Sequence, residues 1–318
     1  MTRRAIIVTG LLGAAVAAIL VLRVIHPPMT IDVSAWFARA IATVGTARPS
    51  FDLSAEACGA CHTDSHREWT ASRPARSWVD PYLQADWAFL GSRRICLNCH
   101  TPIDRQQKEL TVGARGGDPW DPVLAANPEF DPALQREGVT CVACHVRDGV
   151  VHGPNGGLDA PHPTAAWKDP DESCVRCHTA RNTSLVAFLR MPPCGTISEI
   201  ARASGEPPPA ATLLDTPFLK DGPPIAAGTL GCVACHMPAV DRPLTPETPV
   251  RRGRIHRWAG GHDPETLTAA LTLGLSVFPA PSGGTTYGAT LTNTGAAHDI
   301  PTGAAERRLT VTLQTLDD

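Results

Sequence analysis

The chain has 318 residues, enough for one large domain or two ordinary ones. Hydrophobic residues make up 43% and charged residues 19%, which excludes a disordered chain and a polyelectrolyte, and the net charge of −3 gives no basis for a nucleic-acid partner. The chain holds 30 Pro and 27 Gly but only 5% aromatic residues. It is therefore loop-rich and poor in large core side chains, so we expect something other than side chains to fill the interior.

An uncharged apolar run covers residues 5–22, with Arg3 and Arg4 before it and Arg23 after it. The run has the minimum length for a membrane span and exceeds the usual signal-peptide core. The two leading arginines keep the N-terminus in the cytoplasm and direct the rest across the membrane. We therefore expect the run to stay uncleaved and to anchor the protein in a bacterial inner membrane, with the rest of the chain on the periplasmic side. The alternative is a signal cleaved near residues 38–40, which would release the protein to the periplasm or cell surface.

Ten of the eleven cysteines form five Cys-x-x-Cys pairs, and a histidine follows each pair directly. The cysteines are Cys58, Cys61, Cys96, Cys99, Cys141, Cys144, Cys174, Cys177, Cys232 and Cys235, and the histidines are His62, His100, His145, His178 and His236. In this signature both thiols form thioethers to one haem and the adjacent imidazole ligates its iron. Zinc ribbons need paired motifs and no fixed histidine, and a disulfide scaffold needs no histidine either. The pattern predicts five covalently bound haem c groups.

Other histidines compete for the second axial position on each iron. The favoured distal ligands are His162, His256, His262 and His298, which lie in proline- or glycine-containing segments between or after the motifs. His152 and His66 are further candidates, for which a solvent-exposed position is the alternative. Cys194 lacks a following histidine, and we expect a buried thiol there, with sulfur ligation or an intermolecular disulfide as alternatives.

After the last motif the sequence becomes rich in β-formers. Residues 286–292 and 308–314 are both predicted strands, and in the second Leu309, Val311 and Leu313 alternate with polar residues. The loop between them begins at Asn293 and carries His298. We expect a small hairpin that presents this histidine, packs against the haem domain and offers an edge to a partner.

These elements predict a mainly α and irregular-coil fold organised around five covalently bound haems, with a small C-terminal β-hairpin. We divide the chain into an N-terminal anchor or signal (1–28), a spacer (29–54), a multihaem cytochrome domain (55–245) and a C-terminal segment with distal histidines and the hairpin (246–318). Without its haems the chain is not expected to fold, because its apolar side-chain core looks too thin.

Several segments together resemble the cytochrome c-554 and hydroxylamine-oxidoreductase-related family of multihaem c-type cytochromes. They are Cys58 to His62 with Glu68-Trp-Thr-Ala-Ser72, Gly138 to His145 with Asp148 to Pro154, Cys232 to Pro238, His256 to His262, and Ala297 to Gly303 with Arg307-Arg308. The resemblance implies a haem-packed fold, two histidine ligands per haem, and exported electron transfer. Family members usually carry a ligating histidine where this chain has Pro74, so another residue such as His66 must replace it or one haem is left five-coordinate.

Two functions remain open at this point. The first is an exported pentahaem cytochrome that passes electrons between a membrane or periplasmic donor and redox protein partners, including other multihaem cytochromes. Its N-terminal helix would contact the membrane, and no nucleic acid is involved. The second is an oxidoreductase whose five-coordinate haem acts on a small nitrogen or sulfur compound. No Cys-x-x-Cys-Lys motif of the kind found in ammonia-forming nitrite reductases is present, which favours the electron carrier.

Overall fold

The computed structural model describes residues 31–32, 40–43, 51–117, 121–168, 170–178, 181–182, 196, 199, 231–303 and 307–314. The predicted anchor at residues 5–22 and Cys194 lie outside these residues. Among the described residues, no helix has both the length and the apolar character needed to cross a membrane. The proposed domain boundaries stay predictions.

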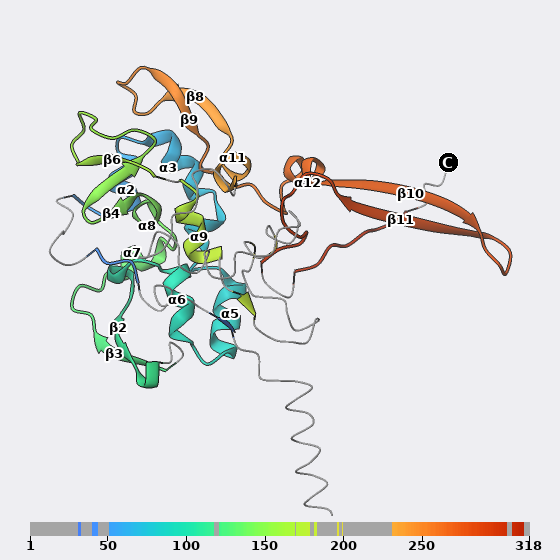
Figure 1. Cartoon of the computed structure of the whole chain (residues 1–318), viewed down its shortest axis with the longest axis horizontal. Helices are drawn as coiled ribbons and strands as arrows, with labels where there is room; N and C mark the ends of the chain where they lie inside the picture. Colours follow the sequence, from blue (N-terminus) through green and yellow to red (C-terminus); the bar gives the residue numbers. More distant parts are fainter. Residues whose placement is uncertain are drawn as a thin grey trace, which may run out of the picture.

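The helices are short, and most of them lie in the first half of the chain (Figure 1). They are α2 (Ala55–Gly59), α3 (Thr63–Thr70), α4 (Arg73–Arg76), α5 (Pro81–Phe89), α6 (Arg94–His100), α7 (Pro132–Arg136), α8 (Cys141–His145), α9 (Glu172–His178), α11 (Cys232–His236) and α12 (Pro264–Ala270). Three of these helices begin with an Asp-Pro pair whose aspartate caps free backbone N–H groups of the first turn: Asp80, Asp131 and Asp263. Proline is favoured at the first helical position because it has no N–H to satisfy.

The strands form small separate sheets. Antiparallel pairs join β1 (Ile31–Asp32) to β7 (Arg181–Asn182), β2 (Glu109–Ala114) to β3 (Pro122–Ala126), β8 (Ala239–Pro243) to β9 (Val250–Arg254), and β10 (Leu271–Pro279) to β11 (Thr285–Asn293). A three-stranded sheet contains β4 (Val146–Arg147), β5 (Val150–Gly153) and β6 (Thr164–Ala166), with β5 and β6 parallel. Helices and irregular coil are present as predicted, but the fold is not mainly α, because small sheets form throughout the described residues.

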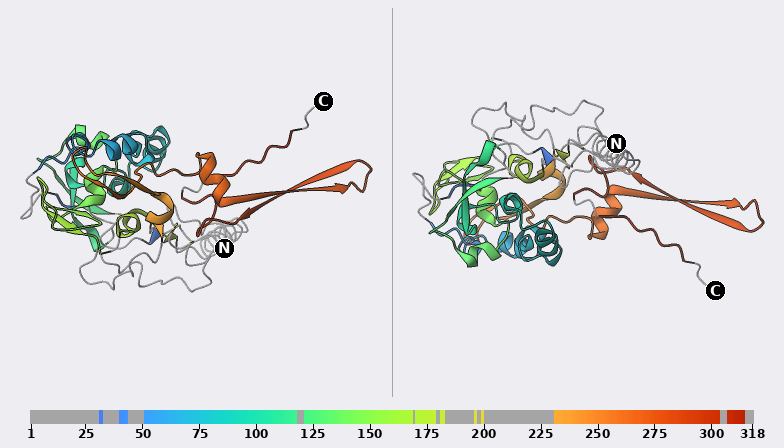
Figure 2. Two further views of the ribbon diagram at one scale, coloured as in Figure 1. Left: turned by 90° about the horizontal axis from the view of Figure 1, so that it is seen from above. Right: turned by 90° about the horizontal axis from the view of Figure 1, so that it is seen from below.

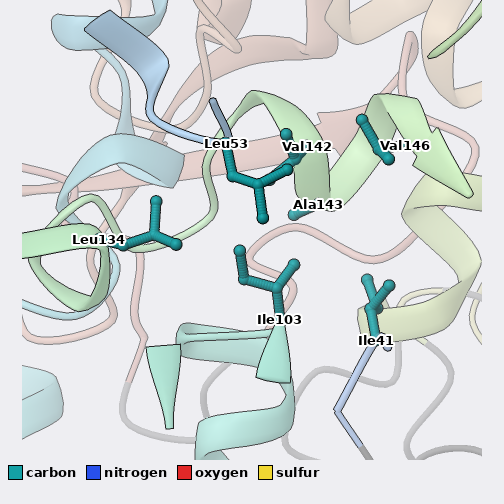
Figure 3. Close-up of a cluster of buried hydrophobic side chains, with 7 residues drawn as sticks. All are labelled: Ile41, Leu53, Ile103, Leu134, Val142, Ala143 and Val146. Atoms are coloured by element: carbon teal, nitrogen blue, oxygen red, sulfur yellow. The ribbon is translucent and has the colours of Figure 1, made fainter. Parts of the chain in front are cut away.

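The apolar core is small and lies between α7, α8 and the segment before α2. Its seven buried residues are Ile41, Leu53, Ile103, Leu134, Val142, Ala143 and Val146. Figure 3 shows the Ile103 side chain pointing toward Leu53 and α8. Next to this cluster the buried Gln106 side chain donates to the carbonyls of Leu134 and Gly138 (2.8 and 2.6 Å). Hydrogen-bonded polar side chains therefore share the interior with a few aliphatic ones.

The C-terminal hairpin differs from the prediction in its pairing and its position. The first predicted strand is present as β11, but its partner is β10, and residues 307–314 form no strand. Residues 280–284 close the hairpin, and Gly283 and Gly284 adopt positive φ values of 86° and 99° that suit a tight turn. This local turn pairs β10 with β11. The alternating pattern of residues 308–314 gave no sign of that pairing. The β10–β11 hairpin projects away from the other sheets and from helices α2 to α9 (Figures 1 and 2).

Candidate haem sites

Each Cys-x-x-Cys-His motif lies on or directly after a single helical turn. The second to fifth motifs lie within α6, α8, α9 and α11, and the first begins in α2 and ends just before α3. Because residues three apart share a helix face, each turn brings its two thiols to the same side. All ten cysteines of the motifs are free thiols. This arrangement leaves every pair available for thioether formation to one porphyrin edge.

Thiols from different motifs touch one another. Cys141 donates a hydrogen bond to Cys58, joining the third motif to the first, and the bond together with burial raises the pKa of Cys141. Cys99 of the second motif donates to Cys177 of the fourth. Cys174, also in the fourth motif, donates to Cys232 of the fifth. The fourth motif therefore lies at the centre of the group, which agrees with the position of α9 in Figure 1.

The third and fourth motifs are also direct neighbours. The Ser173 hydroxyl at the start of the fourth motif donates to the Cys144 carbonyl (3.1 Å). Burial raises the pKa of the Cys144 thiol to about 11. The contacts thus connect all five motifs. The first motif contacts the third, the third contacts the fourth, and the fourth also contacts the second and the fifth.

Three motif histidines face a second histidine from a distant part of the chain. The ring centroids of His62 and His162 are 6.5 Å apart, those of His145 and His256 6.1 Å, and those of His236 and His298 6.1 Å. Two imidazoles on opposite sides of one metal ion have centroids roughly 6 Å apart, because each metal–nitrogen bond is about 2 Å long. Each pair is therefore spaced to hold one iron atom between its rings.

Hydrogen bonds to backbone carbonyls fix the orientation of several of these rings. The Nδ1 atom of His145 lies 2.7 Å from the His152 carbonyl, and that of His62 lies 3.3 Å from the Leu244 carbonyl. The same contact joins His100 to Ser77 (3.0 Å), His256 to Arg254 (2.9 Å) and His298 to Asp299 (2.9 Å). Histidines that bind metals commonly donate one ring N–H in this way, which leaves Nε2 free to ligate.

Burial keeps several imidazoles neutral, and the neutral ring is the form that binds a metal. Burial lowers the pKa of His256 to about 4, and it also lowers the pKa of His145. The neighbouring His145 acts on the pKa of His256 in the same direction.

The other predicted ligands occupy different surroundings. The His152 ring packs on Trp167 with centroids 5.3 Å apart. The His66 ring lies against the first motif, where it would collide with any side chain at Gly59. His262 is exposed. Within the described residues, neither His100 nor His178 makes a ring contact with a second histidine, so the structure does not assign the distal ligands of the second and fourth motifs.

Pro74 contacts the third motif through its backbone. Its carbonyl accepts hydrogen bonds from the N–H groups of Val139 and Ser77 (3.0 and 3.1 Å). Gly138 lies so close to this carbonyl that a Cβ atom there would be 2.8 Å from it, and its φ of +62° also favours glycine. This segment therefore supports the approach to Cys141 and provides no imidazole.

Two arginines near the second motif each have one buried guanidinium nitrogen that suits the carboxylates that every haem carries. The Nε atoms of Arg94 and Arg105 are buried and have no hydrogen-bond partner among the described residues. A buried charged donor without a partner is costly, and a carboxylate is its natural acceptor. Together with the free cysteine pairs and the facing imidazoles, these atoms fit covalently bound haem.

Comparison with known proteins adds little to this picture. No known protein family matches the chain, and no curated protein matches it either. One similar solved structure is a penta-heme cytochrome c552 from Thermochromatium tepidum, with 20% sequence identity and a TM-score of 0.47 over 79% of this chain and 68% of that one.

Proposed function

We propose that this protein is an exported c-type cytochrome that carries five covalently bound haems and passes electrons between a membrane or periplasmic donor and a redox protein partner. The observation that supports it best is the set of three facing imidazole pairs, each of which contains a motif histidine. A haem supplies reversible one-electron chemistry, and two histidine ligands leave its iron no free position for a substrate.

The chain's own residues would have three roles in this proposal. The ten motif cysteines tether the haems, and the motif histidines provide one axial ligand each. His162, His256 and His298 provide the second ligand to the haems of the first, third and fifth motifs. His66, His152 and His262 are the candidates for the haems of the second and fourth motifs.

Contacts between motifs support a branched route for electrons. The first, third and fourth motifs follow one another, and the second and fifth both adjoin the fourth. Haems attached to neighbouring thiols would be close enough for electrons to pass between their edges. In this proposal the fourth haem is the junction, and electrons entering at the first haem leave through the second or the fifth.

The enzyme alternative has one observation in its favour. His100 and His178 have no facing imidazole within the described residues, and Pro74 replaces a usual ligand. If one of these two haems stayed five-coordinate, its iron would be open to a small nitrogen or sulfur compound such as nitrite or hydroxylamine.

Low-temperature EPR of the oxidised protein, with haem content measured on the same sample, tests both functions. We expect five haems per chain, all low-spin. A high-spin signal from one haem in five would favour the enzyme, and nitrite and hydroxylamine would then be added as ligands. Fewer than three low-spin haems per chain would contradict the assignment of the imidazole pairs.

Export and anchoring need a separate experiment. We propose that the N-terminal apolar run holds the protein on the periplasmic side of the inner membrane, from where it meets its redox partners. Fractionation of cells expressing the full chain should place the haem-stained band in the membrane. A haem-stained band in the periplasm that lacks residues 1–28 would show instead that the run is a cleaved signal.

A further inference from the structure

An ion pair links the helix after the first motif to the hairpin before His256. The Glu68 carboxylate on α3 accepts both ends of the Arg242 guanidinium on β8, at 2.5 and 2.9 Å. The two side chains are only 16% and 15% exposed, respectively. A paired, two-point contact of this kind is stronger and more directional than an exposed ion pair.

Glu68 contacts His256 directly, and Arg242 is connected to it through one shared carbonyl oxygen. The same Glu68 oxygen that binds Arg242 also accepts from the His256 backbone N–H (2.8 Å). Arg242 donates to the Arg254 carbonyl (3.0 Å), and that carbonyl also contacts Nδ1 of His256 (2.9 Å). The ion pair therefore fixes both the backbone and the ring of the histidine that faces His145.

The shared carbonyl also gives the pair an electronic effect on the ring. A carbonyl oxygen that accepts from a guanidinium has less electron density left for a second donor, so its bond to the His256 ring is weaker. A weaker bond at Nδ1 makes the imidazole a poorer electron donor to a metal. Arg242 thus favours the reduced metal, and the Glu68 carboxylate opposes this effect because its negative charge favours the oxidised metal.

Both groups are charged in the folded protein. Burial alone would raise the pKa of Glu68, but hydrogen bonds from Arg242 and from His256 hold it below its ordinary value. The hydrogen bond to Glu68 raises the pKa of Arg242.

We propose that Glu68 and Arg242 are positioning residues for His256, which they hold opposite His145 while they set the reduction potential of the haem bound at Cys141 and Cys144. The inference rests on the proposed function and adds to it a device that tunes one haem of the route. It also gives a role to the link between α3, which follows the first motif, and the β8–β9 hairpin, which leads to His256 opposite the third motif.

Potentiometric titration of the single-charge variants tests the proposal. Glu68→Gln keeps an acceptor for the His256 N–H but removes a negative charge, so one of the five midpoint potentials should rise. Arg242→Met removes the positive charge and frees the Arg254 carbonyl, so the same midpoint should fall. The conservative Arg242→Lys should lie closer to the wild type than Arg242→Met does, because it keeps the charge.

A second ion pair on the same hairpin is the matched control. Asp241 and Arg252 are 3.7 Å apart and largely exposed, so Asp241→Asn and Arg252→Met should leave all five midpoints near their wild-type values. Shifts of the same sign in Glu68→Gln and Arg242→Met, or shifts no larger than those of the controls, would overturn the proposal. Haem content distinguishes failure of this proposal from failure of the proposed function. A wild type with fewer than five haems would contradict the proposed function, whatever the midpoint potentials of the variants.

The double variant Glu68→Gln/Arg242→Met tests the positioning role. It keeps the net charge of the pair, so the electrostatic parts of the two shifts should largely cancel. We expect loss of the rigid contact to broaden or convert the low-spin EPR signal of one haem in five. An unchanged EPR spectrum in the double variant would show that the pair does not position His256.

Discussion

The imidazole rings of His236 and His298 lie almost parallel, with centroids 6.1 Å apart and planes inclined by 13°. His236 ends the fifth motif, whereas His298 lies in the loop after β11. The Asn293 side chain at the end of β11 donates to the His298 carbonyl (2.8 Å) and holds this loop in shape. The predicted ligand His298 therefore lies just after the β10–β11 hairpin, whereas the sequence placed it in the loop between the two strands of the hairpin.

Replacement of His298 should open one haem. In His298→Ala we expect one haem in five to change from low-spin to high-spin, because the iron bound by His236 loses its second imidazole. EPR and the visible spectrum of the oxidised protein measure this change. Added free imidazole should restore the low-spin signal, and an unaltered spectrum before imidazole is added would show that His298 is not a ligand.

The apolar core near Ile103 should matter more for stability than the projecting hairpin. Ile103 is fully buried, whereas Leu275 on β10 is 64% exposed. Ile103→Ala should lower the free energy of unfolding by about 2–5 kcal/mol because it leaves a cavity. Leu275→Ala should change it by no more than about 0.5 kcal/mol, as is usual for surface positions. Denaturant titration of the holoprotein compares the two, and equal losses would contradict this description of the core.

Asp171 should stabilise the fifth motif although it precedes the fourth. Its buried carboxylate accepts hydrogen bonds from the N–H groups of Gly231 and Val233, each at 2.9 Å, at the start of α11. Loss of both bonds in Asp171→Ala should cost about 1–3 kcal/mol of folding free energy, because two half-buried N–H groups lose their acceptor. Asp171→Asn should cost less, since its amide oxygen still accepts.

The same denaturant titration measures both Asp171 variants. The control is Asp121→Ala, which removes an exposed ion pair with Arg115 and should have little effect. If Asp171→Ala were as stable as this control, the link between the fourth and fifth motifs would have no energetic importance.

Glu137 should make the protein more stable in mild acid. Burial raises its pKa above the ordinary value of 4.5, although Thr140 and the Ala55 N–H donate to it and act the other way. The folded state therefore takes up a proton at higher pH than the unfolded state does. The stabilisation from this group is fully present below about pH 4.5 and is lost as the pH rises through the folded pKa.

Thermal unfolding at a series of pH values measures this effect. Glu137→Gln should remove the contribution, because its side chain has no charge to titrate. The exposed Glu109 on β2 provides the control, and Glu109→Gln should keep the wild-type dependence. A wild-type dependence in Glu137→Gln would show that another group is responsible.

The sequence by itself determined the local features of this protein. The spacing of Cys141, Cys144 and His145 suits one helical turn with both thiols on one face, and α8 provides that turn. At Asp80, Asp131 and Asp263 the aspartate caps the helix that follows it, through N–H groups two or three residues along the chain. The strand at β11 follows from its own β-rich residues. Each of these features depends only on neighbours along the chain, so no knowledge of the tertiary structure was needed.

Only the tertiary structure decided which distant residues meet. Any of six histidines could have faced His145, and packing of the β8–β9 hairpin against α3 selected His256. The pairing of β11 with β10 was equally hidden, because alternation marks a strand but does not name its partner. The Glu68–Arg242 pair and the contact of Asp171 with α11 left no sequence signal at all. Such contacts form between segments far apart in the chain, and their geometry is set by the packing of the whole molecule.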